Sequence, residues 1–334
     1  MDGTEARRRV MPHSGPIVGI IMRDALDLAG AVATRVARAA VGAHASASDV
    51  DALVALECAA FATWCLVGSW VKGTYSFVDQ LWSVTPVVYV GTYAFASEGV
   101  ARTRLMVMFA CACLWGGRLT HNFARKGGYS GEEDYRWGEL RKHRLLRHRV
   151  AWEIFNVTFI AWYQNVLLLL IALPAAVAHR STEPFELAGI DGVALAAWAT
   201  CFCVEVAADE QQWRFQRSKR GFARKVKGWR DDYERGFLTH GLFSLSRHPN
   251  FWAEQGMWTC FAGFAAASLE SKRFFTPVLT GAVLLILLFQ GSTAFTESIT
   301  ARKYPDYEAY QKTTSRLMPF PRLRALPPPA TKKA

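Results

Sequence analysis

Cysteine is scarce in this sequence, and it is missing from the segments where a secreted disulfide framework would need it. All seven cysteines lie inside apolar runs, where free, buried thiols are the expected state. In each of the two C-x-C pairs the sulfurs stand about 200° apart on a helix, so neither pair can hold one metal ion. The cysteines are Cys58, Cys65, Cys111, Cys113, Cys201, Cys203 and Cys260.

The motifs of soluble nucleotide-binding and hydrolytic enzymes are also missing. Neither GxGxxG nor GxxxxGK followed by Ser or Thr occurs, so no soluble nucleotide-binding fold is indicated. The nucleophile motif GxSxG is absent as well. Two histidine pairs, His143/His148 and His240/His248, lack zinc-like spacing with partner cysteines, so no metal site is predicted. If a nucleotide binds, membrane and juxtamembrane helices must form its pocket.

Charge is present but unevenly spread. Charged residues make up 20% of the chain and hydrophobic residues 51%, a mixture typical of a polytopic membrane protein. The twelve tryptophans suit membrane–water interfaces. A net charge of +11 could indicate nucleic acid binding, but the positive charges cluster in loops between apolar runs. Membrane topology explains that distribution better, so we expect a lipid bilayer and no nucleic acid as partner.

Long apolar runs dominate the rest of the sequence. A hydrocarbon core of about 30 Å needs roughly 20 mostly apolar residues per helix. On that scale we predict an all-α membrane protein with about seven transmembrane helices, of which the third is short. The predicted spans are 52–71, 77–97, 103–118, 154–178, 187–208, 250–268 and 273–293.

Three parts are expected along the chain. Residues 1–50 contain no clean span and are expected to form an amphipathic or partly disordered arm. Residues 51–320 are expected to form the membrane domain, with a short amphipathic helix after Pro305. The basic, proline-rich tail 321–334 is expected to be disordered.

Two loops, 118–149 and 214–247, carry about half of the basic residues. With seven spans, both loops and the basic C-terminus fall on the same side of the membrane. The positive-inside rule makes that side cytosolic.

The segment Gly236–Gln255 concentrates polar groups at the mouth of a predicted membrane helix. If the helix starts near Pro249, Asn250 and Glu254 share one face. Arg247 and His248, next to the helix N-terminus, form a natural anion site. Polar groups at this position are costly unless they bind something.

Three further polar groups lie on the same predicted side, and each has a structural alternative. Arg118 and Asn122 share a face if their helix continues, but the helix could also end in a glycine-rich turn with solvated charges. Glu205 and Asp209 are one turn apart and need a cation or ligand, unless they snorkel toward nearby arginines. Tyr304 could stack on a ring or anchor at the interface.

At these residues the chain resembles a known family. EEDYRW at 132–137, the acidic pair before QQWRFQ, GLFSLSRHPNFWAE at 241–254 and KYPDYEAYQKTTSRLMPF at 303–320 occur in the same order in an uncharacterised family related to the steroid 5α-reductases. The resemblance covers roughly residues 70–320. The wider group includes NADPH-dependent sterol reductases and isoprenylcysteine carboxyl methyltransferases.

The resemblance implies a seven-helix membrane reductase that binds NADPH from the cytosolic side. Reductases of this group carry a Glu and a Tyr in the N-terminal half that address the substrate carbonyl. For those two roles the candidates here are Asp79, Gln80, Tyr89 and Tyr93. The positions that the resemblance assigns to the cofactor are Arg118, Asp209, Arg247, His248, Asn250, Glu254 and Tyr304.

The implied activity is reduction of a C=C bond in an apolar enone, sterol-like or another lipid. Hydride would reach the β-carbon, a hydrogen-bond donor would stabilise the enolate, and a proton would reach the α-carbon. Two alternatives stay open: an S-adenosylmethionine-dependent methyltransferase of a lipid or prenylcysteine, and a non-enzymatic membrane lipid-binding protein. The expected location is the endoplasmic reticulum membrane.

Overall fold

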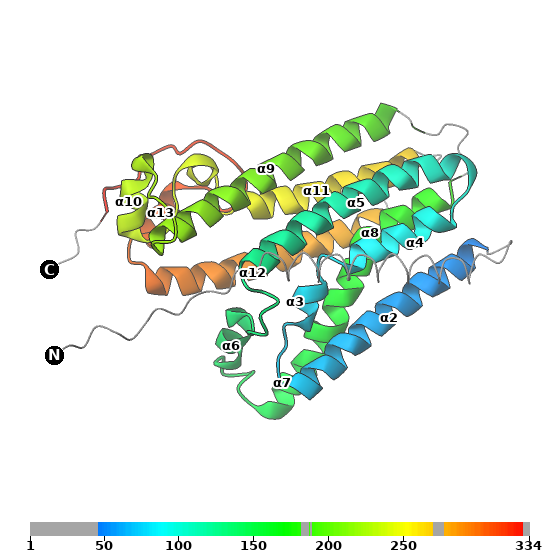
Figure 1. Cartoon of the computed structure of the whole chain (residues 1–334), viewed down its shortest axis with the longest axis horizontal. Helices are drawn as coiled ribbons and strands as arrows, with labels where there is room; N and C mark the ends of the chain where they lie inside the picture. The colour runs from blue at the N-terminus through cyan, green and yellow to red at the C-terminus, as the bar shows by residue number, and fades with distance from the viewer. Residues whose placement is uncertain (1–45, 182–186, 188, 270–276, 330–334) are drawn as a thin grey trace.

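The computed structural model describes residues 46–181, 187, 189–269 and 277–329, and within these ranges the protein is helical, without a β-strand. Figure 1 shows the arrangement of the helices. The elements are α2 (Ala47–Lys72), α3 (Phe77–Leu81), α4 (Thr85–Ala96), α5 (Gly99–Arg125), α6 (Tyr135–Arg141), α7 (Arg149–Phe155), the π-helix η1 (Asn156–Tyr163), α8 (Gln164–His179), α9 (Gly189–Lys219), η2 (Lys227–Trp229), α10 (Arg230–Arg235), η3 (Gly241–Ser244), α11 (Pro249–Ala267), η4 (Pro277–Leu279), α12 (Thr280–Lys303) and α13 (Tyr307–Thr313).

Each predicted span coincides with a helix or with consecutive helices. Among the described residues, five helices are long and apolar enough to cross a membrane: α2, α5, the continuous helix Arg149–His179, α9 and α12. The 12-residue α4 and the 19-residue α11 do not meet that measure. The helical, membrane-type fold is therefore confirmed, whereas the count of seven spans is not established.

The helix at the third predicted span, 103–118, is longer than the apolar run suggests. α5 begins at Gly99 and continues through Asn122 to Arg125, and the chain turns only at Gly127, whose φ is 87°. Arg118 therefore lies about two turns inside the helix rather than in a loop. Its side chain points into the helix bundle because its own helix continues past it.

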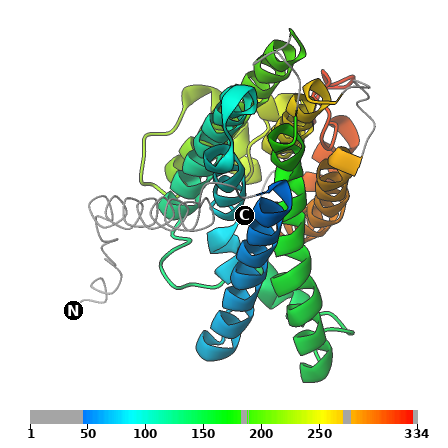
Figure 2. The same ribbon diagram turned by 90° about the vertical axis from the view of Figure 1, so that its right-hand side faces the viewer.

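The interior of the bundle is built around α8. This helix packs against α2, α4, α5, α11 and α12, and ten of its sixteen residues are buried. α9 lies along α11 over much of its length (Figure 1). Figure 2, turned by 90°, shows α2 and the long Arg149–His179 helix side by side at the other edge of the bundle, where they are also in contact.

The helix α2 has one buried stripe and a broad apolar outer face. Its outward residues include Trp64, which is 62% exposed. An apolar face that no other described residue covers suits contact with lipid tails. The stripe itself recurs every three or four residues and consists of Val50, Val54, Cys58, Ala62, Cys65 and Ser69.

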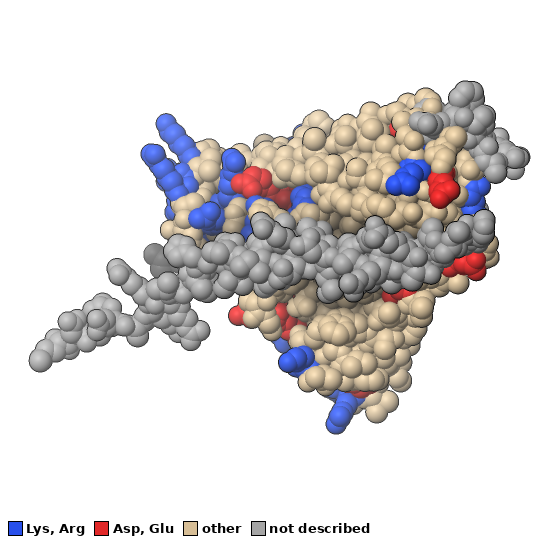
Figure 3. All heavy atoms as spheres, turned by 45° about the vertical axis from the view of Figure 1, so that its right-hand side comes forward, with Lys and Arg blue, Asp and Glu red and all other residues tan. Residues whose placement is uncertain are grey.

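The connections divide the molecule into two ends. Segments 126–148, 220–248 and 304–329 all follow or precede helices at one end, which we call the basic end. In Figure 3, Lys and Arg side chains project at the left of the molecule, while most of the surface visible above the grey atoms is uncharged. At the opposite end a buried ion pair joins α5 to α9, with Arg104 Nε 3.0 Å from Asp191 Oδ1.

The C-terminal segment contains the helix expected after Pro305, which is α13. In the part of the tail that the structure describes, two arginine hydrogen bonds involve residues after 320. Arg322 Nε donates to Thr314 Oγ1 at 2.8 Å, and Arg235 Nη2 donates to the Pro327 carbonyl at 2.6 Å. Most of the predicted N-terminal arm, 1–50, lies outside the described residues.

The seven cysteines, all within the described residues, are free, as predicted. Cys58, Cys65, Cys111 and Cys201 are buried. Cys203 is exposed on α9, so the prediction of burial is wrong for that residue. An outward position on an apolar helix explains it, because the surrounding face is built to contact lipid.

Candidate functional site

Three helices bring charged side chains together near the basic end. Arg118 of α5 reaches α9, where its Nη2 lies 2.8 Å from Glu205 Oε1 and its Nη1 contacts Asp209 Oδ2. Glu254 of α11 lies on the other side, with its Oε2 3.6 Å from Arg118 Nη2. At most 10% of any of these side chains is exposed. We call these four residues the Arg118 cluster.

Amide side chains hold Asp209 in place. Asn122, one turn after Arg118, donates through Nδ2 to Asp209 Oδ2 at 2.8 Å. Asn250 donates through Nδ2 to Asp209 Oδ1 at 3.2 Å. α11 begins at Pro249, so Asn250 and Glu254 share the face that meets α9. Arg118, Asp209, Asn250 and Glu254, four of the seven sequence-predicted cofactor residues, therefore meet at one point.

Two tryptophans that the sequence interpretation missed complete this wall. Trp115 Nε1 donates to both Glu254 oxygens, at 3.0 and 2.9 Å, and Trp258 Nε1 donates to Glu254 Oε1 at 3.1 Å. Their rings meet edge to face at 4.8 Å. Helical spacing could have revealed them, since Trp115 precedes Arg118 by three residues and Trp258 follows Glu254 by four.

The Arg118 cluster has more negative than positive groups. In the part of the chain that the structure describes, Arg118 is the one cation within 4 Å of its three carboxylates. Glu205 Oε2 and Arg118 Nε are buried and lack hydrogen-bond partners among the described residues. A buried carboxylate without full compensation needs a proton, a cation or a donor-rich ligand. The cluster can therefore accept hydrogen bonds from amide, hydroxyl or cationic groups.

Arg247 and His248 lie in a separate cluster around Glu297 of α12. Arg247 Nε donates to Glu297 Oε1 at 2.6 Å, and Arg247 Nη2 donates to Oε2 at 3.1 Å. His248 Nε2 lies 2.9 Å from Glu297 Oε1. Gln311 Nε2 also donates to Glu297, at 3.0 Å. The groups that the sequence marks as an anion site are thus occupied by a carboxylate of the chain itself.

Tyr304 lies at the end of α12, against the end of α9. Lys219 Nζ donates to the Tyr304 hydroxyl at 2.9 Å and to the Gly236 carbonyl at 2.5 Å. Partial burial raises the pKa of the Tyr304 hydroxyl, but the Lys219 and Lys303 ammonium groups together outweigh burial, so the net pKa lies below its usual value. No contact joins Tyr304 to the Arg118 cluster among the described residues.

Asp79, one of the substrate-side candidates, contacts α6, and the backbone carbonyl of Gln80, another, contacts the loop before α6. Asp79 accepts from Arg136 Nη2 at 3.1 Å and from Trp137 Nε1 at 2.9 Å. The Gln80 carbonyl accepts from the Tyr129 hydroxyl at 3.2 Å. These bonds fix the loop to α3, so Asp79 has a structural role at the basic end.

Tyr93, a third candidate, lies near the opposite end. Its hydroxyl donates to Asp51 Oδ1 at 2.9 Å, and Asp51 forms an ion pair with Arg180. The Tyr93 ring also meets the His179 ring at 5.6 Å. This position is remote along the helices from the Arg118 cluster, because α4 and α8 both end there.

Tyr89, the fourth candidate, lies midway along α4 beside an acid that the sequence interpretation overlooked. Tyr89 is fully buried, and its hydroxyl has no hydrogen-bond partner among the described residues. Glu57 of α2 interacts with it electrostatically and accepts from Thr92 Oγ1 at 2.8 Å, while Glu57 Oε2 is unpaired. A single carboxylate in an apolar span marks a functional position by default, and that signal could have identified Glu57.

The fold and these contacts define a class: a helical protein of membrane type with a buried polar cluster near its basic end. Residues 64–314 match the family described as "Protein of unknown function (DUF1295)", and the chain belongs to that family. It is also 36% identical over 266 residues to an uncharacterised protein of Schizosaccharomyces pombe, C594.04c, covering 77% of this chain and 75% of the yeast protein. No solved structure matches.

Proposed function

We propose that the protein is a membrane-embedded, NADPH-dependent reductase of the steroid 5α-reductase type, acting on the C=C bond of an apolar enone, sterol-like or another lipid. The observation that carries the proposal is the convergence of Arg118, Asp209, Asn250 and Glu254 from three helices. The sequence resemblance assigns the same four positions to the cofactor, and their convergence supports that assignment.

The chemistry of the cluster suits the uncharged, donor-rich half of a dinucleotide. A nicotinamide carboxamide and ribose hydroxyls present N–H and O–H groups, for which Glu205 Oε2 is an unpaired acceptor. Trp115 and Trp258 add an aromatic wall. The phosphates would remain toward the basic end, where Arg and Lys side chains are exposed.

On the substrate side we assign the polar groups to Tyr89 and Glu57. Bound NADPH would supply the hydride. The Tyr89 hydroxyl lies beside Cys58 and Thr85 and forms no hydrogen bond of regular geometry among the described residues, so it can donate to a carbonyl oxygen and stabilise the enolate that hydride addition creates. Glu57 can hold the proton that the product requires. Both side chains lie among apolar residues of α2 and α4, which suits a lipid substrate.

NADPH is expected to raise the unfolding temperature of the detergent-purified protein. Saturation at about 100 times Kd contributes roughly 2.7 kcal/mol, which corresponds to a shift of about 4 °C for a chain of this size. Glu254→Gln and Glu205→Gln should each weaken NADPH binding about tenfold, a loss of roughly 1.4 kcal/mol. A dye-based thermal unfolding series at increasing NADPH concentration measures both effects.

The matched control is Glu210→Gln on the same helix. Glu210 is next to Asp209 in the chain, but its side chain is 40% exposed and pairs with Arg125 and Arg214. This variant should bind NADPH as the original protein does. The proposal is lost if NADPH leaves the unfolding temperature unchanged, or if the Glu210 and Glu254 variants respond alike.

One observation favours a second candidate, an S-adenosylmethionine-dependent methyltransferase. Three carboxylates around a single guanidinium would suit a cationic ligand, and S-adenosylmethionine carries a sulfonium and an ammonium group. Under this alternative S-adenosylhomocysteine should stabilise the protein while NADPH does not. The same thermal series with both ligands and NADH decides between the two.

We further propose that the protein resides in the endoplasmic reticulum membrane and that its basic end faces the cytosol. Arg220, Arg224, Lys225 and Lys227 are exposed there. In sealed microsomes trypsin should cut this segment without detergent, and the fragments identified by mass spectrometry should end at those residues. Cleavage after Arg180, exposed at the opposite end, should require permeabilisation. The reverse pattern would invert the orientation.

A further inference from the structure

Buried polar atoms without partners follow one side of α2. Five buried side-chain oxygens on this side lack a hydrogen-bond partner in the described part of the chain. Leaving one such group unpaired costs about 1–3 kcal/mol, so a series of them is retained only where they bind water or a ligand. We call this series the polar row. Its members are Glu57 Oε2, Tyr89 Oη, Thr85 Oγ1, Asn165 Oδ1 and Asn156 Oδ1.

The contacts of the row with α2 set its order. Tyr89 packs on Phe61, with ring centroids 6.1 Å apart. Asn165 Nδ2 lies 3.7 Å from Cys65 Sγ, and Asn156 Nδ2 donates to Ser69 Oγ at 2.9 Å. These α2 positions advance steadily toward the basic end. From Glu57 to Ser69 the helix rises by about 18 Å, which is the length of the row.

Thr85 extends the row from Tyr89 by one turn of α4. It lies one turn before Tyr89, on the same face of α4. Since α4 runs antiparallel to α2, that turn leads toward the basic end. Thr85 is fully buried, and its hydroxyl is unpaired. The row thus continues from α4 to the long helix that includes α8.

The π-helix η1 aligns the two asparagines. Nine residues of regular α-helix turn through about 900°, which would put Asn156 and Asn165 on opposite faces. Because η1 separates them and a π-helix turns less per residue, both amides contact α2 instead. This local departure from α-helix therefore has a specific result, a continuous line of amide oxygens along one neighbour.

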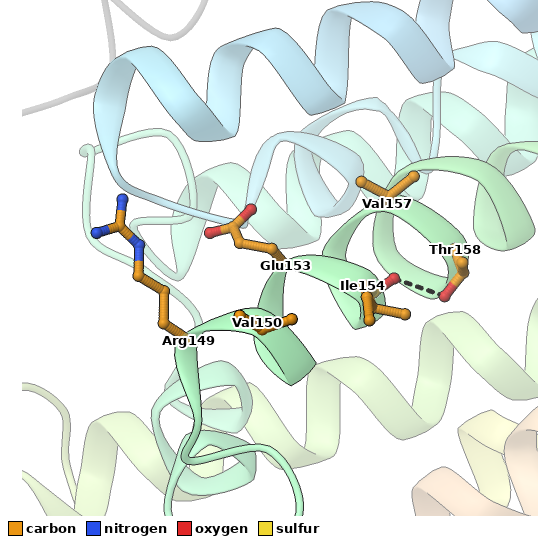
Figure 4. Close-up of a pocket in the computed structure, with 6 residues that line it drawn as sticks. All are labelled: Arg149, Val150, Glu153, Ile154, Val157 and Thr158. Atoms are coloured by element: carbon orange, nitrogen blue, oxygen red, sulfur yellow. Dashed lines mark hydrogen bonds between the residues drawn. The ribbon is translucent and has the colours of Figure 1, made fainter.

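The outer end of the row lies beside a surface pocket of about 440 Å³. Glu153, three residues before Asn156, lines this pocket and points toward α2 (Figure 4). Its carboxylate accepts from Trp70 Nε1 at 3.0 Å and from the Tyr75 hydroxyl at 3.4 Å. The remaining lining residues are Arg149, Val150, Ile154, Val157 and Thr158.

We propose that the polar row conducts protons between the Glu153 pocket and the Glu57–Tyr89 pair, through water molecules bound to its unpaired oxygens. The use of the row rests on the proposed function. Reduction of an enone joins one hydride from NADPH and one proton from water to the C=C bond, and releases NADP⁺ and the saturated ketone. The enolate takes its proton from the Glu57–Tyr89 pair, and the row returns a proton to that pair after each turnover.

The decisive variant is Thr85→Val, because it removes one unpaired hydroxyl at nearly constant volume. If Thr85 had only a structural role, this change would leave stability equal or higher, since an unsatisfied buried group is lost. If the row conducts protons, Thr85→Val should slow hydrogen–deuterium exchange of the Glu57 carboxyl proton about tenfold or more. Asn165→Leu provides a second interruption of the row. Thr63→Val, an exposed threonine of α2 bonded to the Ala59 carbonyl, is the matched control.

Infrared spectroscopy measures this exchange without any substrate. At a pH low enough to protonate Glu57, its carboxyl C=O band is identified by its loss in Glu57→Gln. The rate at which the band shifts after transfer to D₂O reports proton movement along the row. Slower exchange in Thr85→Val and Asn165→Leu, but not in Thr63→Val, supports the proposal. Unchanged exchange in both row variants overturns it.

A second measurement separates the row from the proposed function. NADPH oxidation is followed with a steroid 4-en-3-one as the probe enone, in H₂O and in D₂O. The solvent isotope effect on kcat should rise in Thr85→Val while the NADPH-dependent thermal shift stays the same. If the row variants slow proton exchange at Glu57 but the protein reduces no enone, the proton pathway stands and the reductase proposal fails. If the protein reduces the enone but the row variants leave proton exchange at Glu57 unchanged, the reductase proposal stands and the proton pathway fails.

Discussion

Replacing Arg118 with methionine should lower the free energy of unfolding by about 3–5 kcal/mol, the largest loss we expect from a single substitution in the Arg118 cluster. Glu205, Asp209 and Glu254 would lose the one cation within 4 Å of them in the described structure. Their mutual repulsion would act in a region from which water is largely excluded. Thermal and denaturant unfolding in detergent measure the loss, which corresponds to a fall in unfolding temperature of about 4–7 °C.

Two further variants separate this charge effect from a general loss of packing. Arg214→Met removes a cation whose side chain is 68% exposed and pairs with Glu210, so it should cost less than about 1 kcal/mol. Adding Glu205→Gln to Arg118→Met removes one repelling carboxylate and should restore part of the stability. A double variant no more stable than Arg118→Met alone would show that charge imbalance is not the cause.

The helical membrane fold could be predicted because apolar run length depends on local sequence alone. A span of about 20 apolar residues has few folded alternatives, so all seven predicted positions contain helix. The ends were harder to predict. α5 continues from its apolar run to Arg125 because Arg118 and Asn122 find partners on α9, and a partner on another helix is invisible to hydropathy.

The candidate site was predictable where the spacing itself has geometric meaning. Asn250 and Glu254, four residues apart after Pro249, had to share a helical face. Their convergence with Arg118 depends on how α5 and α11 lie against α9, which no local pattern specifies. Arg247 and His248 show the limit of the method. Their residue types suggested an anion site, but the anion is Glu297, fifty residues later in the chain.

Glu57 was missed for a different reason. Polar clusters stand out in a sequence where several charged residues are neighbours, whereas Glu57 is the one charged residue of the predicted span 52–71. Its partners Tyr89 and Thr92 belong to another helix. The cost of an isolated carboxylate in an apolar helix was the available signal, and it indicates function more strongly than a charged loop does.

Arg247→Met should destabilise the protein by about 3–5 kcal/mol, because Glu297 would remain buried without its guanidinium. Arg247 also connects α12 with the C-terminal segment, since its Nη1 donates to the carbonyls of Gln311 and Thr314. That segment should then detach. Hydrogen exchange should accelerate at the Phe320 amide, which donates to the Leu245 carbonyl at 3.0 Å. Detergent unfolding and exchange mass spectrometry measure the two effects.

A double variant distinguishes a structural Arg247 from one that binds the cofactor. Replacing both members of a buried ion pair with apolar residues is often neutral, whereas removing one member leaves an unpaired charge. Arg247→Met combined with Glu297→Leu should therefore recover part of the lost stability. If the pair serves to hold the chain before Asn250, stabilisation by NADPH should recover as well, because Asn250 returns to Asp209. If Arg247 binds the cofactor phosphates, the double variant should be stable and still fail to respond to NADPH.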